Sequence, residues 1–115
     1  MSKRDNQLLA QDMLESSLKI KDYVKAYSYE DFINDGKTID AVVRNFEIIG
    51  EAASRIDPDF QIEHSQIPWK KLKGYRNRLI HDYFGVDYQI VWDIISDDLN
   101  TLITKLEGIT GPNKT

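Results

Sequence analysis

Apolar residues recur at intervals of three, four and seven positions along most of the chain, which is the spacing of one face of an α-helix. Residues 6–27 and residues 38–56 each carry one such stripe, with polar residues between the apolar ones. The positions of the two stripes are Leu9, Met13, Ile20, Val24, Tyr27, Ile39, Val42, Phe46, Ile49, Ala53 and Ile56. The pattern predicts two long amphipathic helices.

Residues with capping and turn preferences separate these two helices. Ser28 followed by Asp31 resembles a capping box, which would open a short helix that continues through Phe32. Asp35 and Gly36 are then predicted to end the short helix, because glycine adopts the left-handed conformation at no steric cost.

The 38–56 helix contains a glycine and is followed by a proline. Gly50 costs about 1 kcal/mol relative to alanine inside a helix, and either a close helix approach or backbone access to a ligand would offset that cost. Pro58 is predicted to end the helix. Residues 57–66 are expected to form a loop with at most one short turn.

Two further helices are predicted in the second half of the chain. Pro68 suits the first turn of a helix that continues to Tyr83, because the missing proline N–H would be unpaired there. Asp87 is the predicted N-cap of a last helix over residues 88–107. The helically spaced positions are Trp69, Leu72, Arg76, Leu79, Tyr83, Val91, Ile95, Leu99, Leu102 and Leu106.

The length of 115 residues fits one domain, and no segment alternates with period two for long enough to indicate a strand. We therefore expect an all-α fold, a single-domain up-and-down bundle of about five helices over residues 1–108, with a short tail at 109–115. No apolar run approaches the ~18 residues of a membrane span, and the N-terminus lacks the apolar core of a secretory signal. A cytoplasmic protein is expected.

Composition restricts the chemistry that the chain can perform. It has no cysteine, which excludes disulfides, thiolate metal sites and cysteine nucleophiles. His64 and His81 are the only histidines, so we expect neither a metal nor a cofactor. The acidic residues Asp93, Asp97 and Asp98 are interpreted as a solvated helix face rather than a metal site.

The net charge of −4 argues against a nucleic-acid-binding protein, but the distribution of charge changes that conclusion. Residues 69–78, WKKLKGYRNR, carry +5 and no acidic residue, so the other 105 residues carry −9. Such a segment is either a solvated helix face or an RNA-binding surface. The candidate RNA-binding residues are Lys70, Lys71, Lys73 and Arg78.

The residues that follow this segment can carry acid–base chemistry. On a continuous helix Arg76 and Tyr83 would share one face, and Asn77 and His81 would share an adjacent one. Histidine exchanges protons near neutral pH, arginine binds phosphate oxygens through its fork, and asparagine can orient either partner. These groups suffice for RNA cleavage by the ribose 2′-hydroxyl without a metal. An arginine and a histidine on one helix can equally be structural.

The pattern from Arg76 to Tyr83, RNRLIHDY, resembles the Arg-x4-His-x-Tyr signature of the HepT toxins in the HEPN superfamily. Residues 41–52, with Arg44 and the sequence IGEA, are similar to the third helix of that family. The resemblance extends to Leu106. It implies an all-α HEPN-like bundle that pairs as a homodimer, with the motifs of both protomers meeting in a cleft that cleaves RNA without a metal.

The resemblance also implies roles for single residues. His81 would be the acid–base residue, Arg76 would stabilise the transition state, and Asn77 would assist its orientation. Tyr83 would accept AMP from an MntA-like minimal nucleotidyltransferase, the antitoxin of such systems. In addition, Arg44 and Glu51 lie seven residues apart and either border the same cleft or form an ion pair.

Two other functions remain open from the sequence. The chain could be a non-enzymatic helical subunit that docks to the nucleotidyltransferase and presents substrate to it, or a purely structural helical dimer. Trp69 and Trp92 are expected to be core or dimer anchors, and His64 is expected on the surface.

Overall fold

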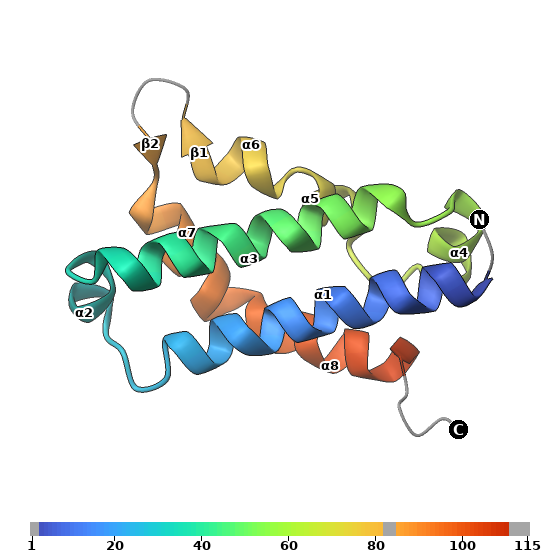
Figure 1. Cartoon of the computed structure of the whole chain (residues 1–115), viewed down its shortest axis with the longest axis horizontal. Helices are drawn as coiled ribbons and strands as arrows, with labels where there is room; N and C mark the ends of the chain where they lie inside the picture. The colour runs from blue at the N-terminus through green and yellow to red at the C-terminus, as the bar shows by residue number, and fades with distance from the viewer. Residues whose placement is uncertain (1–2, 82–84, 111–115) are drawn as a thin grey trace.

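The computed structural model describes residues 3–81 and 85–110, which form helices and one short pair of strands (Figure 1). The expected all-α class is confirmed. The elements are α1 Lys3–Tyr23, α2 Tyr29–Ile33, α3 Gly36–Arg55, α4 Pro58–Glu63, α5 Trp69–Lys73, α6 Tyr75–Leu79, β1 Ile80–His81, β2 Gly85–Val86, α7 Tyr88–Asp97 and α8 Leu99–Thr110. No helix in the described ranges is long and apolar enough to cross a membrane.

The two long helices α1 and α3 lie side by side and form one layer of the bundle, against which the shorter helices pack (Figure 1). Helix α8 packs against α1, and α5 and α6 pack against α3. Every apolar position predicted to face inward that the structure describes is buried, except Tyr27, which is half-buried. Tyr83 lies outside the described residues. One continuous core therefore joins the helices, as the periodicity predicts.

The predicted caps of α2 and α7 are confirmed. Ser28 and Asp31 exchange both hydrogen bonds of a capping box, and the Asp87 carboxylate accepts from the N–H of Ile90 at 3.1 Å. A capping side chain satisfies backbone N–H groups that have no partner within the helix.

The prediction that Gly36 ends the short helix is wrong. Asn34 is the C-cap of α2, and Gly36 is the first residue of α3. The reason is that Asp35 acts as the N-cap of α3, because its carboxylate accepts from the backbone N–H and the hydroxyl of Thr38. The conformation of this glycine is helical, so its freedom at positive φ is not used.

The predicted fourth helix, from Pro68 to Tyr83, is also wrong as a single element. Helix α5 ends at Gly74, whose N–H bonds to the carbonyls of Lys70 and Lys71 at 3.2 Å, and α6 ends at Leu79. Tyr75, not Arg76, is the core residue of α6, with 1% of its surface exposed. The cause is packing, because the Tyr75 ring fits against Phe46.

Three smaller differences concern the flanking segments. Residues 57–66, expected as a loop, contain the six-residue helix α4 with Pro58 as its first residue. The predicted last helix is interrupted at Asp98, which caps α7 and forms an ion pair with Lys71. Helix α8 continues to Thr110, past the expected boundary at residue 108.

The chain leaves α6 in an extended conformation and turns back on itself. Ile80 pairs with Val86 and His81 with Gly85 in the antiparallel β1–β2 pair. Gly85 has a φ of +72°, which glycine adopts readily. His81 is therefore not on a helix, and the helix face predicted for Asn77 with His81 is wrong. The face predicted for Arg76 with Tyr83 stays a prediction. Tyr83 itself lies outside the described residues.

Candidate active site

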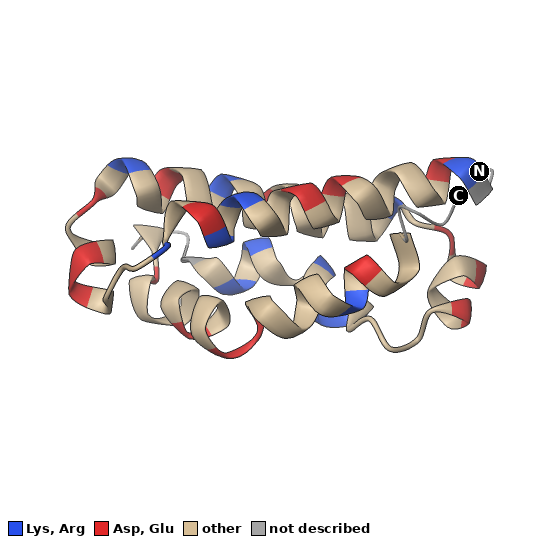
Figure 2. Ribbon diagram, turned by 90° about the horizontal axis from the view of Figure 1, so that it is seen from below, with Lys and Arg blue, Asp and Glu red and all other residues tan. Residues whose placement is uncertain are grey.

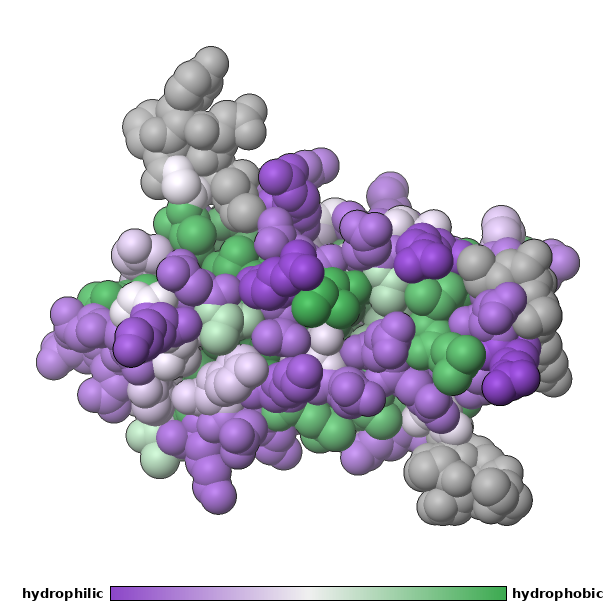
Figure 3. All heavy atoms as spheres, in the orientation of Figure 1, coloured by the Kyte–Doolittle hydropathy of each residue, from purple (hydrophilic) through white to green (hydrophobic). Residues whose placement is uncertain are grey.

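One face of α3 is polar and points away from the core. Its buried face carries residues such as Phe46 and Ile49, so positions three and four residues apart on the other side face outward. Figure 3 shows hydrophilic side chains interspersed with a few apolar ones over this side of the molecule, and Figure 2 shows acidic and basic residues mixed along the long helices. The outward-facing residues are Arg44, Glu47, Ile48, Glu51 and Arg55.

Helices α5 and α6 approach this face closely because of Gly50. A Cβ atom at Gly50 would lie 2.9 Å from the carbonyl oxygen of Leu72, which is closer than side chains tolerate. The predicted close helix approach at Gly50 is thus confirmed. The Tyr75 ring packs edge-on against Phe46 with centroids 5.1 Å apart, which fixes α6 against α3. Arg76, the next residue, consequently lies at the α3 face.

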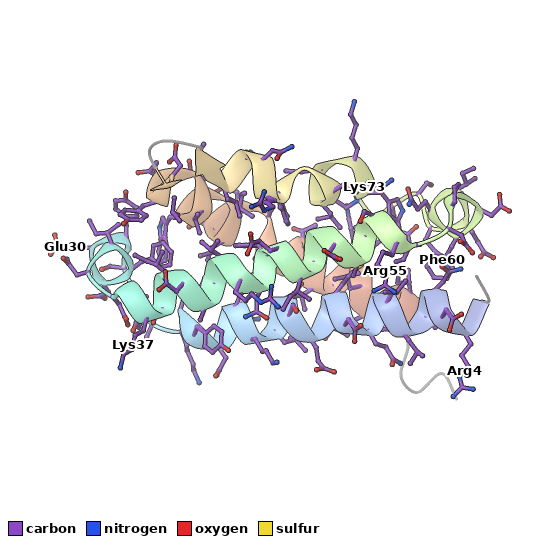
Figure 4. All side chains as sticks on the ribbon, turned by 45° about the horizontal axis from the view of Figure 1, so that its top comes forward. Arg4, Glu30, Lys37, Arg55, Phe60 and Lys73 are labelled. Carbon is purple, nitrogen blue, oxygen red and sulfur yellow. The ribbon has the colours of Figure 1, made fainter. Side chains whose placement is uncertain are left out.

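A groove runs between α1, α3 and the α5–α6 segment, and we call it the α3 groove. Its volume is about 520 Å³. Its charged lining residues come from four helices, and Figure 4 shows Arg55 and Lys73 toward one end of it. These residues are Asp12, Arg44, Glu47, Glu51, Arg55, Lys73 and Arg76. Arg44, Glu51 and Arg76, singled out in the sequence, are therefore brought to one groove.

Arg76 is held at the groove by an ion pair with Glu47. The Nε atom of Arg76 lies 3.3 Å from Oε2 of Glu47, and the two side chains are 72% and 27% exposed. The contact joins one edge of the guanidinium, at Nε, to the Glu47 carboxylate. A guanidinium can bind two phosphate oxygens through its terminal donors.

Glu47 was not identified as a site residue from the sequence, although its spacing indicates that it shares a helix face with Arg44 and Glu51. It lies three residues after Arg44 and four before Glu51, which places all three on one face of a helix. The ion pair to Arg76 joins α3 to α6 and could not be inferred without the packing of these helices.

The other predicted catalytic residues follow Arg76 closely in the chain. Asn77 is exposed on α6, and its side chain makes no hydrogen bond to another described residue. His81 lies in β1, directly after α6, with its backbone paired to Gly85. The side chain of His81 and the whole of Tyr83 lie outside what the structure describes.

The basic segment divides between two sides of α5–α6. Arg76 and Lys73 line the α3 groove, whereas Lys70, Lys71, Lys73 and Arg78 line a second depression, described below. The Lys71 Nζ lies 2.6 Å from Asp98 Oδ2. The Lys73 Nζ donates to Gln61 Oε1 at 3.1 Å.

The two tryptophans and His64 pack against phenylalanine rings. Trp69 is buried, and its Nε1–H donates to the carbonyls of Gln61 and His64, so its role as a core anchor is confirmed. Trp92 is half-buried against Phe32, with centroids 5.2 Å apart. His64 is half-buried and stacks on Phe60 rather than lying freely on the surface.

The acidic residues of the last two helices do not converge on a metal position. Asp98 pairs with Lys71, and Asp93 accepts from Gln89 at 2.8 Å. Within residues 3–81 and 85–110, no group of three or more histidine, aspartate or glutamate side chains is placed to hold a metal ion.

The sequence of the chain matches a known ribonuclease family. Residues 13–109 match the family described as "Ribonuclease HepT-like". The chain is 41% identical to "Putative RNase MJ1380" of Methanocaldococcus jannaschii, covering 93% of this chain and 98% of the relative. It is 39% identical to "Probable ribonuclease HepT" of Thermococcus cleftensis, covering 93% and 97%. No solved structure gives a significant match. The chain belongs to the HepT-like ribonuclease family.

Proposed function

We propose that the protein is a metal-independent endoribonuclease, the toxin of a HepT/MntA toxin–antitoxin system, acting on cytoplasmic RNA. The observation that carries this proposal is the position of Arg76 at the α3 groove, where Glu47 holds it through Nε. His81 follows five residues later in β1, so the same short segment supplies a cation and a titratable group.

The reaction would use these groups in defined roles. His81 accepts the proton of the ribose 2′-hydroxyl, and the 2′ oxygen forms a bond to phosphorus. The bond from phosphorus to the 5′ oxygen breaks, and that oxygen receives a proton from a protonated His81. Arg76 binds the phosphate oxygens, on which negative charge increases in the transition state, and Asn77 assists. The products carry a 2′,3′-cyclic phosphate and a 5′-hydroxyl.

The proposal includes a homodimer, and the charges of α3 support a specific arrangement. Asp40, Arg44, Glu51 and Arg55 are exposed on α3. If two copies of α3 pair antiparallel around a two-fold axis between residues 47 and 48, Arg44 faces Glu51 of the partner subunit. Asp40 then faces Arg55 of the partner subunit, because both pairs share that midpoint. A two-fold interface of this kind is isologous and closed.

This arrangement would also complete the site. The two-fold axis would bring the α3 grooves of both copies, each with its own Arg76, to one interface. Residues of two protomers could then act on one phosphate, as the family resemblance implies.

Regulation by AMP transfer to Tyr83 is the last part of the proposal. An MntA-like nucleotidyltransferase would attach AMP to the Tyr83 hydroxyl, two residues after His81 in the sequence. The added phosphodiester is an anion that could occupy Arg76 in place of RNA phosphate, and the adenosine would fill space that RNA needs. An intact-mass measurement after co-expression tests this step, since it predicts addition of AMP that Tyr83→Phe prevents.

Cleavage assays test the activity. Arg76→Ala and His81→Ala should each abolish RNA cleavage while the helical circular dichroism signal remains. Cleavage by the unaltered chain should persist in EDTA and leave 2′,3′-cyclic phosphate ends. Lys37→Ala is the matched control, because Figure 4 places Lys37 at the end of the molecule far from Lys73. Activity that required Mg²⁺, or that survived both substitutions, would contradict the proposal. A chain that binds the nucleotidyltransferase but cleaves no RNA would favour the non-enzymatic binding subunit.

A further inference from the structure

A second depression lies between α4 and the α5–α6 segment, and we call it the α4–α5 hollow. Its volume is about 920 Å³. Its apolar lining residues are Pro58, Ile62, Pro68 and the largely buried Trp69, and Ile62 is 75% exposed. Ile62 is therefore a large apolar side chain that the bundle itself does not cover.

The rim of the α4–α5 hollow is basic. Lys70, Lys71, Lys73 and Arg78 line it, and no acidic residue among those that the structure describes does, although the whole chain has a net charge of −4. In the described part of the chain, Lys71 pairs with Asp98, whereas Lys70 and Arg78 form no ion pair. The acidic residues of α4 do not line the hollow. Anionic groups are thus attracted to the edge of an apolar surface.

Lys73 lines both the hollow and the α3 groove. Its Nζ donates to the neutral side chain of Gln61. An anion that binds Arg76 in the groove and extends past Lys73 would therefore meet the basic residues Lys70 and Arg78, which line the hollow.

We propose that the α4–α5 hollow is a subsite for an unpaired nucleobase of a single-stranded RNA substrate. The base rests on Ile62 and the two prolines, and the flanking phosphates lie at Lys70, Lys73 and Arg78. Single-stranded RNA is bound in this way, by a positive track for the backbone beside apolar or aromatic surfaces for the bases. The inference rests on the proposed ribonuclease function and adds a substrate class. Lys73, which lines both the hollow and the α3 groove that contains Arg76, favours RNA over an acidic protein segment.

Binding measurements with uncleavable RNA test this inference independently of cleavage. The probes are fully 2′-O-methylated strands of about 12 and about 4 nucleotides, which bracket the usual span of a single-strand site. The unaltered chain should bind the long strand more tightly than the short one. Ile62→Glu and Lys70→Glu should each weaken binding of the long strand about tenfold and remove this difference. Lys37→Glu, an exposed lysine at the far end of the molecule, is the charge control and should preserve it.

An abasic scan locates the base. In a set of long strands that each lack one base, one strand should bind the unaltered chain about tenfold more weakly than the intact strand does. The same missing base should have little effect on RNA binding by the Ile62→Glu variant. Absence of any such strand, or equal binding of the long strand by all variants, overturns the inference. If Ile62→Glu leaves RNA binding intact but abolishes binding of the nucleotidyltransferase, the hollow is a protein-docking surface, which also overturns it.

The outcomes separate this inference from the proposed function. RNA cleavage combined with unchanged binding by Ile62→Glu refutes the subsite and leaves the ribonuclease intact. No cleavage, combined with the predicted binding differences, refutes the ribonuclease and supports an RNA-binding hollow.

Discussion

The Nε atom of Arg76 on α6 lies 3.3 Å from Oε2 of Glu47 on α3. Because Arg76 is 72% exposed, solvent screens this ion pair, and its contribution to the free energy of unfolding is about 1 kcal/mol or less. Its effect is on orientation, since it holds one edge of the guanidinium against α3 and directs the other edge elsewhere. Glu47 is thus a positioning residue for the proposed phosphate-binding group.

Glu47→Gln should therefore lower activity without destabilising the fold. The variant keeps the size of the side chain but loses the charge that holds Arg76, so the kcat for RNA cleavage should fall about tenfold with little change in KM. Steady-state kinetics and thermal unfolding measure the two effects. Glu30→Gln on α2 is the control and should retain full activity, because Figure 4 shows Glu30 far from Lys73 of the α3 groove. A kcat equal to that of the unaltered chain would mean that the ion pair is incidental.

Gly50→Ala tests the close approach of α3 and α5. The new methyl group would lie 2.9 Å from the Leu72 carbonyl oxygen, so the helices must separate, at a cost of about 1–3 kcal/mol in the free energy of unfolding. Gly108→Ala in α8 is the matched control, because no atom lies within 4 Å of the added group. That change should stabilise the protein by about 0.5–1 kcal/mol. Urea unfolding measures the free energy of unfolding of both variants, and equal values would contradict the close approach of α3 and α5.

The helical stripes and most caps could be predicted from the sequence because they depend on local spacing and chemistry. The break at Gly74 could not, since both Tyr75 and Arg76 continue the helical interval from Leu72. The choice between them is made by Phe46, a residue of another helix, against which the Tyr75 ring packs. Burial of an aromatic side chain outweighs burial of a permanent cation.

The end of α6 also depends on contacts that spacing does not encode. The N–H of Asp87 bonds to the carbonyl of Leu79 at 2.9 Å, and this long-range bond replaces the next turn of helix. Strands of two residues are too short to show an alternating pattern. The residues of the RNRLIHDY motif could therefore be identified from the sequence, whereas the extended conformation at His81 could not.

The pH dependence of folding should include a contribution from Asp35. A hydrogen bond from the Tyr27 hydroxyl, followed by those from the Thr38 side chain and backbone, lowers the pKa of Asp35 from 3.8 to about 2. Because the folded-state pKa is the lower one, the stabilisation is present above about pH 3.8 and is lost as the pH falls toward about 2.

Asp35→Asn should accordingly reduce the loss of stability over that pH range, and Tyr27→Phe should reduce it in part by removing the largest cause. Urea unfolding at a series of pH values measures both effects. An unchanged acid dependence in Asp35→Asn would show that other carboxyl groups determine it.

Charge reversal on α3 tests the proposed dimer register. Arg44→Glu alone would place a glutamate opposite Glu51 of the partner subunit twice in each dimer, since the two-fold axis repeats every contact. The dissociation constant should rise about tenfold or more. Glu51→Arg alone should act in the same direction by opposing arginines, whereas the double variant restores opposite charges and should restore the dimer.

Sedimentation equilibrium at low ionic strength measures these constants, because salt screens exposed pairs. The second pair offers an independent check, since Asp40→Arg combined with Arg55→Asp should behave as the first double variant does. Lys25→Glu, outside α3, controls for the change in net charge. If the single variants weaken the dimer and both double variants restore it, each pair of residues must meet across the two-fold axis. Double variants that dissociate as readily as the singles would therefore exclude an antiparallel α3 interface centred between residues 47 and 48.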